Sequence, residues 1–535
     1  MKTKDLEKML NKSIKYILLF ILSFQVIMFA QKKEIVAYYA GGDSYNSYFV
    51  KNIKTSGSAD KITVLIYAFA TPGPDSSGNI IAHINPYIDY QQVYSSSMSI
   101  DGVADDSTQS LRGQFNQLKK LKAEYPKIKI LLSFGGWGGG TYFSDASLTS
   151  KSRELFVNDC INKFIIGNLP KIKNAGGNGV AAGIFDGFDI DWEFPVSGGP
   201  EGTHNNINDK ENFTKLLALF RKKLNLINPK LILTAAVAAD KPNLNNYDIK
   251  SAEKYLNWFN LMTYDFHGSW NNTTAHHTNL LSSPKDTTDN DAEHSFDKSV
   301  KYFIDSLGIN SKKIIPGAAF YGKCWYDVDS ANGGLYQPGR DSSGVFKDGF
   351  GNFSNLRTIE SMGYKYYWDG LAMAPWFYNS KEKIFWTLDD TKSIALKSRY
   401  ADAYNLGGLM FWEISGDDSI GTLVNTIFTR NMPDLIIKGS RIDKKFPLIK
   451  IIAPNRLEII KHGSNFIINT SELFHSDLIA KVEFFVDGVS IGYDTKAPFD
   501  WVWFNVPKGR HKIQAVAMDK MGKKNISRAI IINVD

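Results

Sequence analysis

Residues 185–195 read Phe-Asp-Gly-Phe-Asp-Ile-Asp-Trp-Glu-Phe-Pro and place four acidic residues inside an otherwise apolar run. Side chains alternate along a β-strand, so Asp189, Asp191 and Glu193 share one face with about 7 Å between successive members, and Asp186 falls outside this alternation. Buried carboxylates are costly unless they are paired or hydrogen-bonded, and perturbed acids gather at functional sites. The pattern therefore predicts a buried strand that ends in a catalytic site.

The same run resembles the DxxDxDxE signature of glycoside hydrolase family 18, the chitinases and their relatives, and it matches every fixed position. The resemblance implies an α/β fold, a (β/α)8 TIM barrel whose fourth strand carries the run. It also implies that Glu193, the last acid of the signature, is the general acid. Barrel enzymes keep their active sites at the carboxyl ends of the strands, where Glu193 would lie.

The length and composition of the chain fit a large enzyme with an additional domain. A chain of 535 residues exceeds most single cores and predicts one large domain with a smaller companion. Aromatic residues make up 13%, which suits both the stacking of sugar rings and a large barrel core. The net charge of +7 comes without a basic stripe interleaved with aromatics, so we expect no nucleic-acid partner.

Eight apolar, β-rich runs recur with helical stretches between them, the pattern of a parallel sheet closed by crossover helices. They cover residues 35–39, 62–69, 128–134, 183–192, 231–237, 259–264, 314–321 and 408–412. The catalytic domain is expected to span 31–430. A long aromatic-rich stretch at about 323–397, between the seventh and eighth strands, resembles the α+β insertion domain that deepens the cleft in one subgroup of the family.

The N-terminal residues predict an export signal. Five lysines lie between positions 2 and 15, and an apolar stretch follows from position 16 to Ala30. This order predicts a signal peptide in 1–30, a mature, secreted chain from about Gln31, and no stable membrane association after cleavage. An uncleaved anchor is the alternative, because Met28-Phe29-Ala30 is a poor small-x-small cleavage site.

A change of pattern after about position 430 predicts a second domain. Residues 431–446 are interpreted as a polar, basic linker, and 447–535 hold short alternating strands with a hairpin signal at Asp487-Gly488. This segment resembles bacterial immunoglobulin-like modules and is expected to form an all-β sandwich. Trp501 and Trp503 share one strand face, either as a chitin-binding platform or as sandwich core.

Two further motifs agree with the family. Ser133-Phe134-Gly135-Gly136-Trp137 resembles its SxGGW motif, which implies that Ser133 and Tyr38 hydrogen-bond Asp189 while the glycines let the backbone pass close to the site. Residues 262–265 read Met-Thr-Tyr-Asp and resemble its MxYD motif.

Within the second motif, the resemblance places Met262 at the substrate. Tyr264 would hold the acetyl oxygen of the substrate in its attacking position, and Asp265 would bind near the cleavage point.

Other aromatic positions also match the family. Trp137 and Trp270 match aromatics that line the sites beyond the cleaved bond, and Trp412 matches the floor under the distorted sugar. One position departs from the commonest form, because Tyr321-Gly322-Lys323 stands where many relatives have an aromatic-Gly-Arg. A planar, bidentate contact would there become a point charge with looser geometry, which leaves open the sugar that Tyr321 and Lys323 bind.

The resemblance further implies a retaining mechanism in which the N-acetyl oxygen of the substrate, not a protein carboxylate, is the nucleophile. Glu193 would protonate the leaving oxygen, and Asp191 would hydrogen-bond the acetamido N–H and stabilise the oxazolinium cation. Adjacent carboxylates cannot all ionise cheaply, so coupled titration should raise the pKa of Glu193 and keep it protonated near neutral pH.

A chitinase (EC 3.2.1.14) acting on chitin or chitooligosaccharides is the function that these motifs favour. An endo-β-N-acetylglucosaminidase on N-glycans and a chitin-binding lectin with a weak site are the alternatives. Glu193, Asp191 and Tyr264 disfavour the lectin, while the MxYD motif and the insertion disfavour the glycan-trimming enzyme.

The remaining polar residues suggest no further chemistry. No His/Cys cluster has metal-ligand spacing, so we expect neither metal nor cofactor, and we expect a monomer. His267, His276 and His277 are predicted to lie on a surface loop. Cys160 and Cys324 are predicted to be free and buried.

Overall fold

The computed structural model describes residues 33–286, 288, 294–341, 349–431, 448–454, 459–474, 479–520 and 522–535. The predicted signal peptide 1–30 and all of the predicted linker 431–446 except Asn431 lie outside these residues. None of the helices in the described ranges combines the length and hydropathy of a segment that crosses a membrane.

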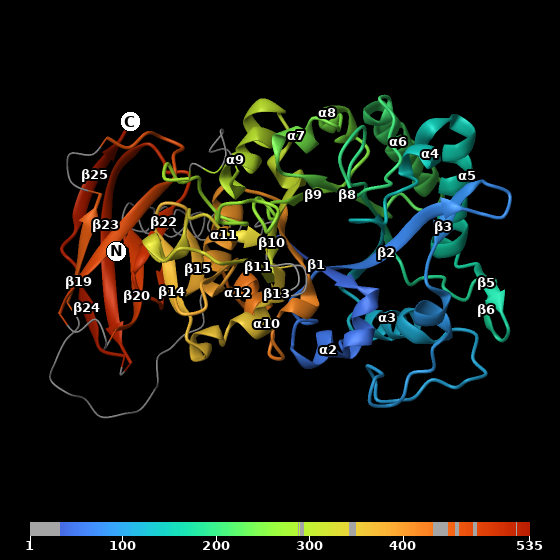
Figure 1. Ribbon diagram of the computed structural model, residues 1–535, viewed down its shortest axis with the longest axis horizontal. Helices are drawn as coiled ribbons and strands as arrows, with labels where there is room; N and C mark the ends of the chain where they lie inside the picture. Colours follow the sequence, from blue (N-terminus) through green and yellow to red (C-terminus); the bar gives the residue numbers. More distant parts are fainter. Residues whose placement is uncertain are drawn as a thin grey trace, which may run out of the picture. The chain divides into compact units, whose positions relative to one another are not determined.

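Eight parallel strands close into a barrel, as the sequence predicts, because β1 pairs with both β2 and β17. Figure 1 labels β1, β2, β8, β9 and β10 of this barrel. Their side chains are nearly all buried, which explains the continuous apolar runs in the sequence. The strands in spatial order are β1 (Glu34–Ala40), β2 (Val64–Pro74), β4 (Lys129–Gly135), β7 (Gly187–Asp191), β8 (Ile232–Ala238), β9 (Trp258–Met262), β10 (Ile314–Ala319) and β17 (Gly408–Trp412).

Helices cover the outside of the barrel, and their burial follows a helical period. In α6 (Asp209–Ile227), Phe213, Leu217, Phe220 and Leu224 are all buried on one stripe. The other helices are α2 (Val50–Thr55), α3 (Gly113–Glu124), α4 (Phe143–Leu148), α5 (Ser150–Cys160), α7 (Lys241–Leu244), α8 (Ile249–Ala252), α9 (Phe296–Lys301), α11 (Thr391–Ala403) and α12 (Thr422–Thr429). Two short antiparallel additions are β3 (Ile80–His83) beside β2 and the pair β5 (Leu169–Ile172) with β6 (Ala175–Gly177).

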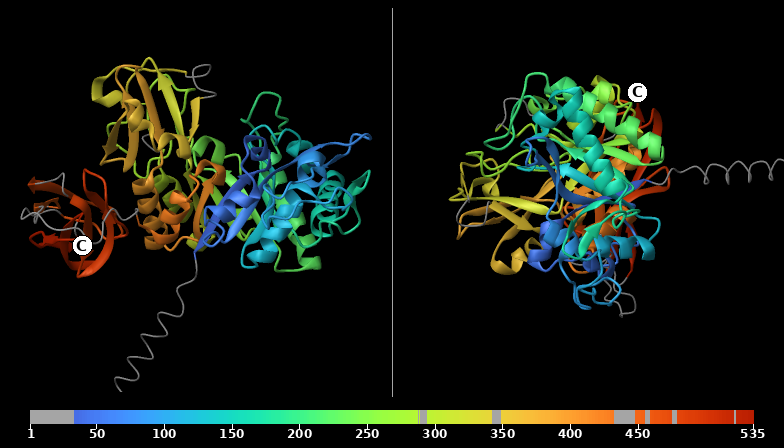
Figure 2. Two further views of the ribbon diagram at one scale, coloured as in Figure 1. Left: turned by 90° about the horizontal axis from the view of Figure 1, so that it is seen from below. Right: turned by 90° about the vertical axis from the view of Figure 1, so that its right-hand side faces the viewer.

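The predicted insertion forms an antiparallel sheet between β10 and β17, seen as the yellow and gold strands in Figure 2. It consists of β11 (Tyr321–Tyr326), β12 (Arg340–Asp341), β13 (Phe350–Asn352), β14 (Lys365–Asp369), β15 (Ala374–Asn379) and β16 (Ile384–Leu388), with α10 (Phe353–Leu356) after β13. The sheet ends at Leu388, so the predicted range 323–397 reaches into α11. The side chain of Asp390 accepts hydrogen bonds from the backbone of Lys392 and Ser393 and begins that helix.

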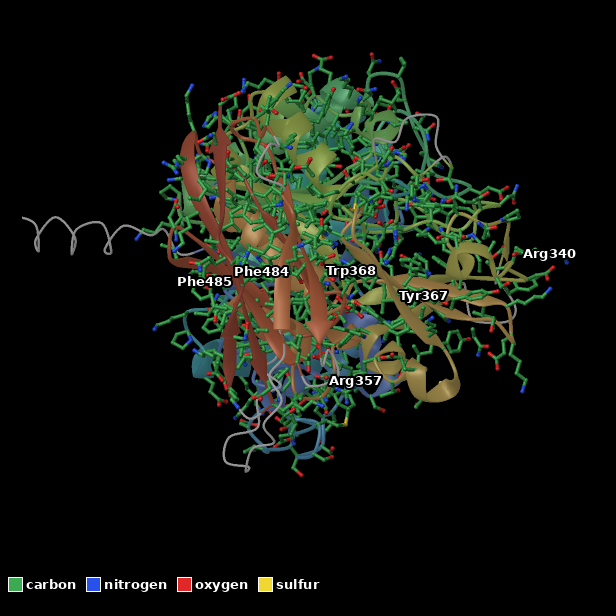
Figure 3. The ribbon with its side chains drawn as sticks, turned by 90° about the vertical axis from the view of Figure 1, so that its left-hand side faces the viewer. Arg340, Arg357, Tyr367, Trp368, Phe484 and Phe485 are labelled. Atoms are coloured by element: carbon green, nitrogen blue, oxygen red, sulfur yellow. The ribbon has the colours of Figure 1, made fainter. Side chains whose placement is uncertain are left out.

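The C-terminal region forms two antiparallel sheets, in agreement with the predicted sandwich. The strands are β18 (Leu448–Ala453), β19 (Phe466–Phe474), β20 (Ile479–Val486), β21 (Val489–Asp494), β22 (Asp500–Trp503), β23 (Gly509–Asp519), β24 (Lys524–Ile526) and β25 (Ile530–Val534). Trp501 is 0% exposed and Trp503 is 8% exposed. The Trp501 ring stacks on Phe484 of β20, and Figure 3 labels Phe484. The hypothesis that these tryptophans form a binding platform is wrong, because both side chains are buried.

Lys392 of α11 joins the barrel to this module through a buried ion cluster. Its side chain is 0% exposed, and its ammonium lies 2.7 Å from Asp494 and 2.9 Å from Asp500. It also donates a 2.7 Å hydrogen bond to the Pro498 carbonyl. The ring of Trp368, labelled on the insertion strand β14 in Figure 3, lies 4.1 Å from the same ammonium. The module, the insertion and the barrel therefore meet at one lysine.

Candidate active site

Asp189 is the polar centre of the barrel interior. It is fully buried on β7, in register with Ser133 of β4 and Thr234 of β8. Tyr38 and Ser133 donate hydrogen bonds of 2.8 and 2.9 Å to Oδ2, as the sequence predicts, and Thr234 and Asn260 donate bonds of 2.5 and 3.1 Å to Oδ1. Burial raises the pKa of Asp189 and these four bonds oppose the rise. A carboxylate with four donors and no exposure is a structural anchor that substrate cannot reach.

Two glycines allow β4 to approach the acidic strand. Gly135 has φ +107°, and a Cβ there would lie 2.1 Å from the Asp191 carbonyl oxygen. Gly136 has φ +76°, donates a 2.9 Å hydrogen bond to the same carbonyl, and leaves no room for a Cβ beside Phe69. The SxGGW motif therefore needs both glycines to fix the backbone next to Asp191.

Asp191 and Glu193 form a coupled acid pair. β7 ends at Asp191, not at Trp192 as predicted, so Glu193 lies just past the strand and is half-buried. Burial raises the pKa of Glu193 to about 8, with the negative charge of Asp265 adding to the rise and the hydrogen bond with Asp191 opposing it. Burial also raises the pKa of Asp191 well above its ordinary value, and the charges of Glu193 and Asp189 add to this. A hydrogen bond between two carboxyl groups requires a proton, so the pair holds one at neutral pH.

Asp191 and Glu193 line a cleft of about 850 Å³ at the carboxyl ends of the strands. The cleft brings together most residues that the sequence predicts for the site, namely Tyr38, Trp137, Asp191, Glu193, Met262, Tyr264, Asp265, Trp270, Tyr321, Lys323 and Trp412. Ser133 and Asp189 lie below it and contribute through hydrogen bonds. Trp137 and Trp270 are 66% and 59% exposed, so large aromatic surfaces face the solvent of the cleft.

Trp412 is held from two sides at the base of the cleft. Its ring stacks on Phe69 with 5.5 Å between centroids, and Tyr38 lies 5.6 Å away at a tilted angle. Tyr264, just past the end of β9, lines the same cleft, and its ring lies 6.1 Å from that of Tyr321 in a T-shaped arrangement. These contacts fix a flat apolar floor beside a tyrosine hydroxyl.

Asp265 is held as an anion. Its Oδ1 accepts a 2.8 Å hydrogen bond from the Tyr321 hydroxyl and lies 3.3 Å from the Lys323 ammonium and 3.7 Å from His277 Nδ1. Desolvation by the surrounding protein opposes ionisation, but Lys323 and His277 outweigh it and lower the pKa of Asp265 to about 2. The negative charge that helps to keep Glu193 protonated is therefore permanent at neutral pH.

The surface location predicted for His267, His276 and His277 is wrong. The three residues are 1%, 1% and 0% exposed. Their loop folds back beneath the insertion, where the His276 ring lies 5.7 Å from Trp376 and the His277 ring 5.2 Å from Tyr321. Burial lowers the pKa of His277, although Asp265 opposes the shift, so the ring is neutral at neutral pH.

Comparisons with known proteins agree with this geometry. The family model described as glycosyl hydrolases family 18 matches residues 34–417, and one described as a bacterial Ig domain matches residues 447–515. This chain belongs to glycosyl hydrolase family 18.

Individual chitinases are similar to this chain over about 70% of its length. Chitinase A1 of Niallia circulans is 31% identical over 72% of this chain and 57% of its own length, and chitinase C of Streptomyces lividans is 34% identical over 70% and 56%. The catalytic domain of psychrophilic chitinase B from Arthrobacter is 32% identical, with a TM-score of 0.69 over 74% of this chain and 95% of that domain. The chain thus spans a little over half the length of these two curated relatives.

Several residues of the family 18 site escaped sequence reasoning. Thr234 and Asn260 are single polar residues within apolar strands, a signal that could have marked them as inward donors. Phe69 and Phe350 also line the cleft, and no local pattern distinguishes them from core aromatics. His277 reaches Asp265 from a loop whose path the sequence does not reveal.

Proposed function

We propose that this protein is a chitinase that hydrolyses β-1,4-linked N-acetylglucosamine polymers by a retaining, substrate-assisted mechanism. The observation that carries the proposal is the position of Asp191 and Glu193, which line an aromatic-rich cleft at the carboxyl end of β7. The raised pKa of Glu193 supports it. The relatives named chitinases, at 31–34% identity, support the same substrate class.

Glu193 acts as the proton donor to the glycosidic oxygen. A carboxyl group with a pKa of about 8 is almost fully protonated at pH 6 to 7, as general acid catalysis requires. The acetyl oxygen of the bound sugar attacks the anomeric carbon while the bond to the leaving oxygen breaks, and water then opens the oxazolinium intermediate with net retention. Glu193, deprotonated by the first step, accepts the proton of that water.

The neighbouring groups orient the acetamido group. Asp191 has one buried carboxyl oxygen, Oδ1, without a partner among the described residues, and it is well suited to accept the acetamido N–H. Tyr264, whose pKa burial raises well above its ordinary value, stays a hydroxyl donor for the acetyl oxygen. Asp189 and Asp265 do not serve as nucleophiles in this scheme, since the first is enclosed by four donors and the second is held by three side chains.

We also propose that the enzyme works outside the cell. The support is the signal-like sequence of residues 1–30 and the size of a polymeric substrate.

A substrate comparison tests the proposed function. The purified protein is incubated with chitin oligomers, with fully deacetylated chitosan and with a high-mannose glycoprotein. Cleavage of the first alone supports a substrate-assisted chitinase, and proton NMR of the fresh product should show the β-anomer. Release of the glycan would favour the glycan-trimming alternative, binding of oligomers without cleavage the lectin, and an initial α-anomer would exclude the mechanism.

A further inference from the structure

One face of the insertion sheet turns three side chains toward the cleft. Tyr321 and Lys323 are two residues apart on β11 and therefore lie on the same face. In the antiparallel register with β13, Lys323 stands directly opposite Phe350, so these two side chains are also neighbours. The Phe350 ring stacks on the Tyr321 ring, with 4.8 Å between centroids and 19° between planes.

The Lys323 ammonium is surrounded by aromatic rings. It lies 5.2 Å from the centroid of Trp270, 5.4 Å from that of Tyr321 and 5.8 Å from that of Phe350, distances at which a cation is attracted to a ring face. The same ammonium lies 3.3 Å from Asp265, so the charge is balanced. A lysine in this position gathers rings from two separate segments, the loop after β9 and the insertion strand β13.

The backbone also helps to position Trp270. A Cβ at Gly268 would lie 2.3 Å from the Trp270 ring, so the ring rests on the glycine. Even so, Trp270 is 59% exposed and Phe350 38%, and both line the cleft. Two aromatic rings are therefore held in place by the protein on one part of their surface and remain partly exposed to the cleft on the rest.

We propose that Phe350 is a substrate-stacking residue which the insertion supplies, and that Lys323 is a positioning residue which fixes Phe350 and Trp270 as one wall for a neutral N-acetylated sugar. The apolar C–H face of a β-linked sugar fits a flat, partly exposed ring, and a wall whose cation is already paired with Asp265 attracts no ionic group. This inference rests on the proposed function. It extends that function by giving the insertion a direct role in binding the chain.

Calorimetry of chitohexaose binding in the Glu193→Gln protein tests the proposal without turnover. Adding Phe350→Ala should weaken binding about 3- to 10-fold, the scale of one lost stacking contact, while Phe350→Tyr should stay within about twofold of the parent. Lys323→Met should weaken binding to a similar extent and Lys323→Arg should restore it, because only the cation aligns the rings. In the enzyme with Glu193 intact, Phe350→Ala should raise KM and leave kcat nearly unchanged.

The outcomes separate this inference from the proposed function. If the parent Glu193→Gln protein binds no chitohexaose, both fail. If Phe350→Ala binds as tightly as its parent, the stacking role alone is overturned, and if Lys323→Met behaves like its parent, the positioning role is overturned. Should Phe350→Ala fail to fold, Phe350→Leu keeps an apolar side chain without the flat ring, and weaker binding by that variant supports the role while unchanged binding refutes it.

Discussion

Replacing Glu193 by Gln removes the ionisable proton of the side chain and keeps its size and shape. At pH 6 a carboxyl group with a pKa of about 8 is about 99% protonated, whereas one at the ordinary value of 4.5 is only about 3% protonated. The protein environment therefore supplies about 30 times more of the acid form at that pH. We expect Glu193→Gln to lower kcat at least about 100-fold, the scale of lost general acid catalysis.

The pH dependence gives a second, independent expectation. Wild-type kcat/KM should fall on the alkaline side with an apparent pKa near 8, which belongs to the coupled pair of Asp191 and Glu193. The residual activity of Glu193→Gln should lack that limb. The assay is hydrolysis of a soluble chitooligosaccharide between pH 4 and pH 10, about the range needed to see both limbs.

The substitution Glu193→Gln should lower activity but raise stability at alkaline pH. Because the folded pKa of Glu193 lies above its unfolded value, the free energy of unfolding falls as pH rises from about 4.5 to about 8. That difference corresponds to on the order of 5 kcal/mol before solvent in the cleft screens it. Glu193→Gln should therefore unfold at a higher temperature than the wild type at pH 9 and at nearly the same temperature at pH 5.

Asp186 provides a matched control on the same segment. Its carboxylate points away from the cleft, pairs with Lys122 at 2.8 Å and accepts a 2.9 Å hydrogen bond from the Ile130 backbone. Asp186→Asn should keep near-normal kcat and the alkaline limb. Near-normal turnover by pure Glu193→Gln, or an alkaline limb that survives in it, would refute the assignment of Glu193 as the acid.

Three further predictions follow from other contacts. Tyr264→Phe should lower kcat about 10- to 100-fold with little change in KM, measured by steady-state kinetics, because the lost hydroxyl acts on the attacking acetyl group; a change confined to KM would contradict this role. Asp189→Asn turns an amide toward four hydrogen-bond donors. Calorimetric melting should therefore show a loss of about 2–4 kcal/mol of stability, and activity should also be reduced. An unchanged melting temperature would argue against Asp189 as a structural anchor. Lys392→Met leaves the buried carboxylates of Asp494 and Asp500 unpaired and should lower the free energy of unfolding by about 3–5 kcal/mol. Adding Asp494→Asn and Asp500→Asn should restore part of that stability. Equal melting temperatures for all these proteins would mean that the ion cluster contributes nothing to stability.

The barrel and its acids could be predicted from the sequence because their signals are local. Each strand is a continuous apolar run, and the alternation in 185–195 sets which carboxylates face inward. The hydrogen bonds from Tyr38 and Ser133 to Asp189 could also be predicted, since the family motifs place both donors at known strand ends.

The residues that were missed depend on long-range geometry. Phe350 meets Lys323 only through the antiparallel register of two strands that are separated by a long stretch of chain. His277 is polar and flanked by polar residues, so nothing local predicts that its loop is buried under the insertion. The alternating pattern of Trp501 and Trp503 is the same for a strand face that is buried and for one that is open to a ligand, so the sequence does not distinguish the two cases.

The Lys392 cluster limits how this protein can be divided. In a fragment that stops near residue 430, the Lys392 ammonium would lose both carboxylate partners, which the module supplies. The ammonium and the neighbouring Trp368 indole would then be exposed to solvent. A grafted sandwich would need acids at the places of Asp494 and Asp500 to seal it again. The C-terminal module therefore buries part of the barrel surface. Replacing it with another module would require a matching interface and not only a suitable linker.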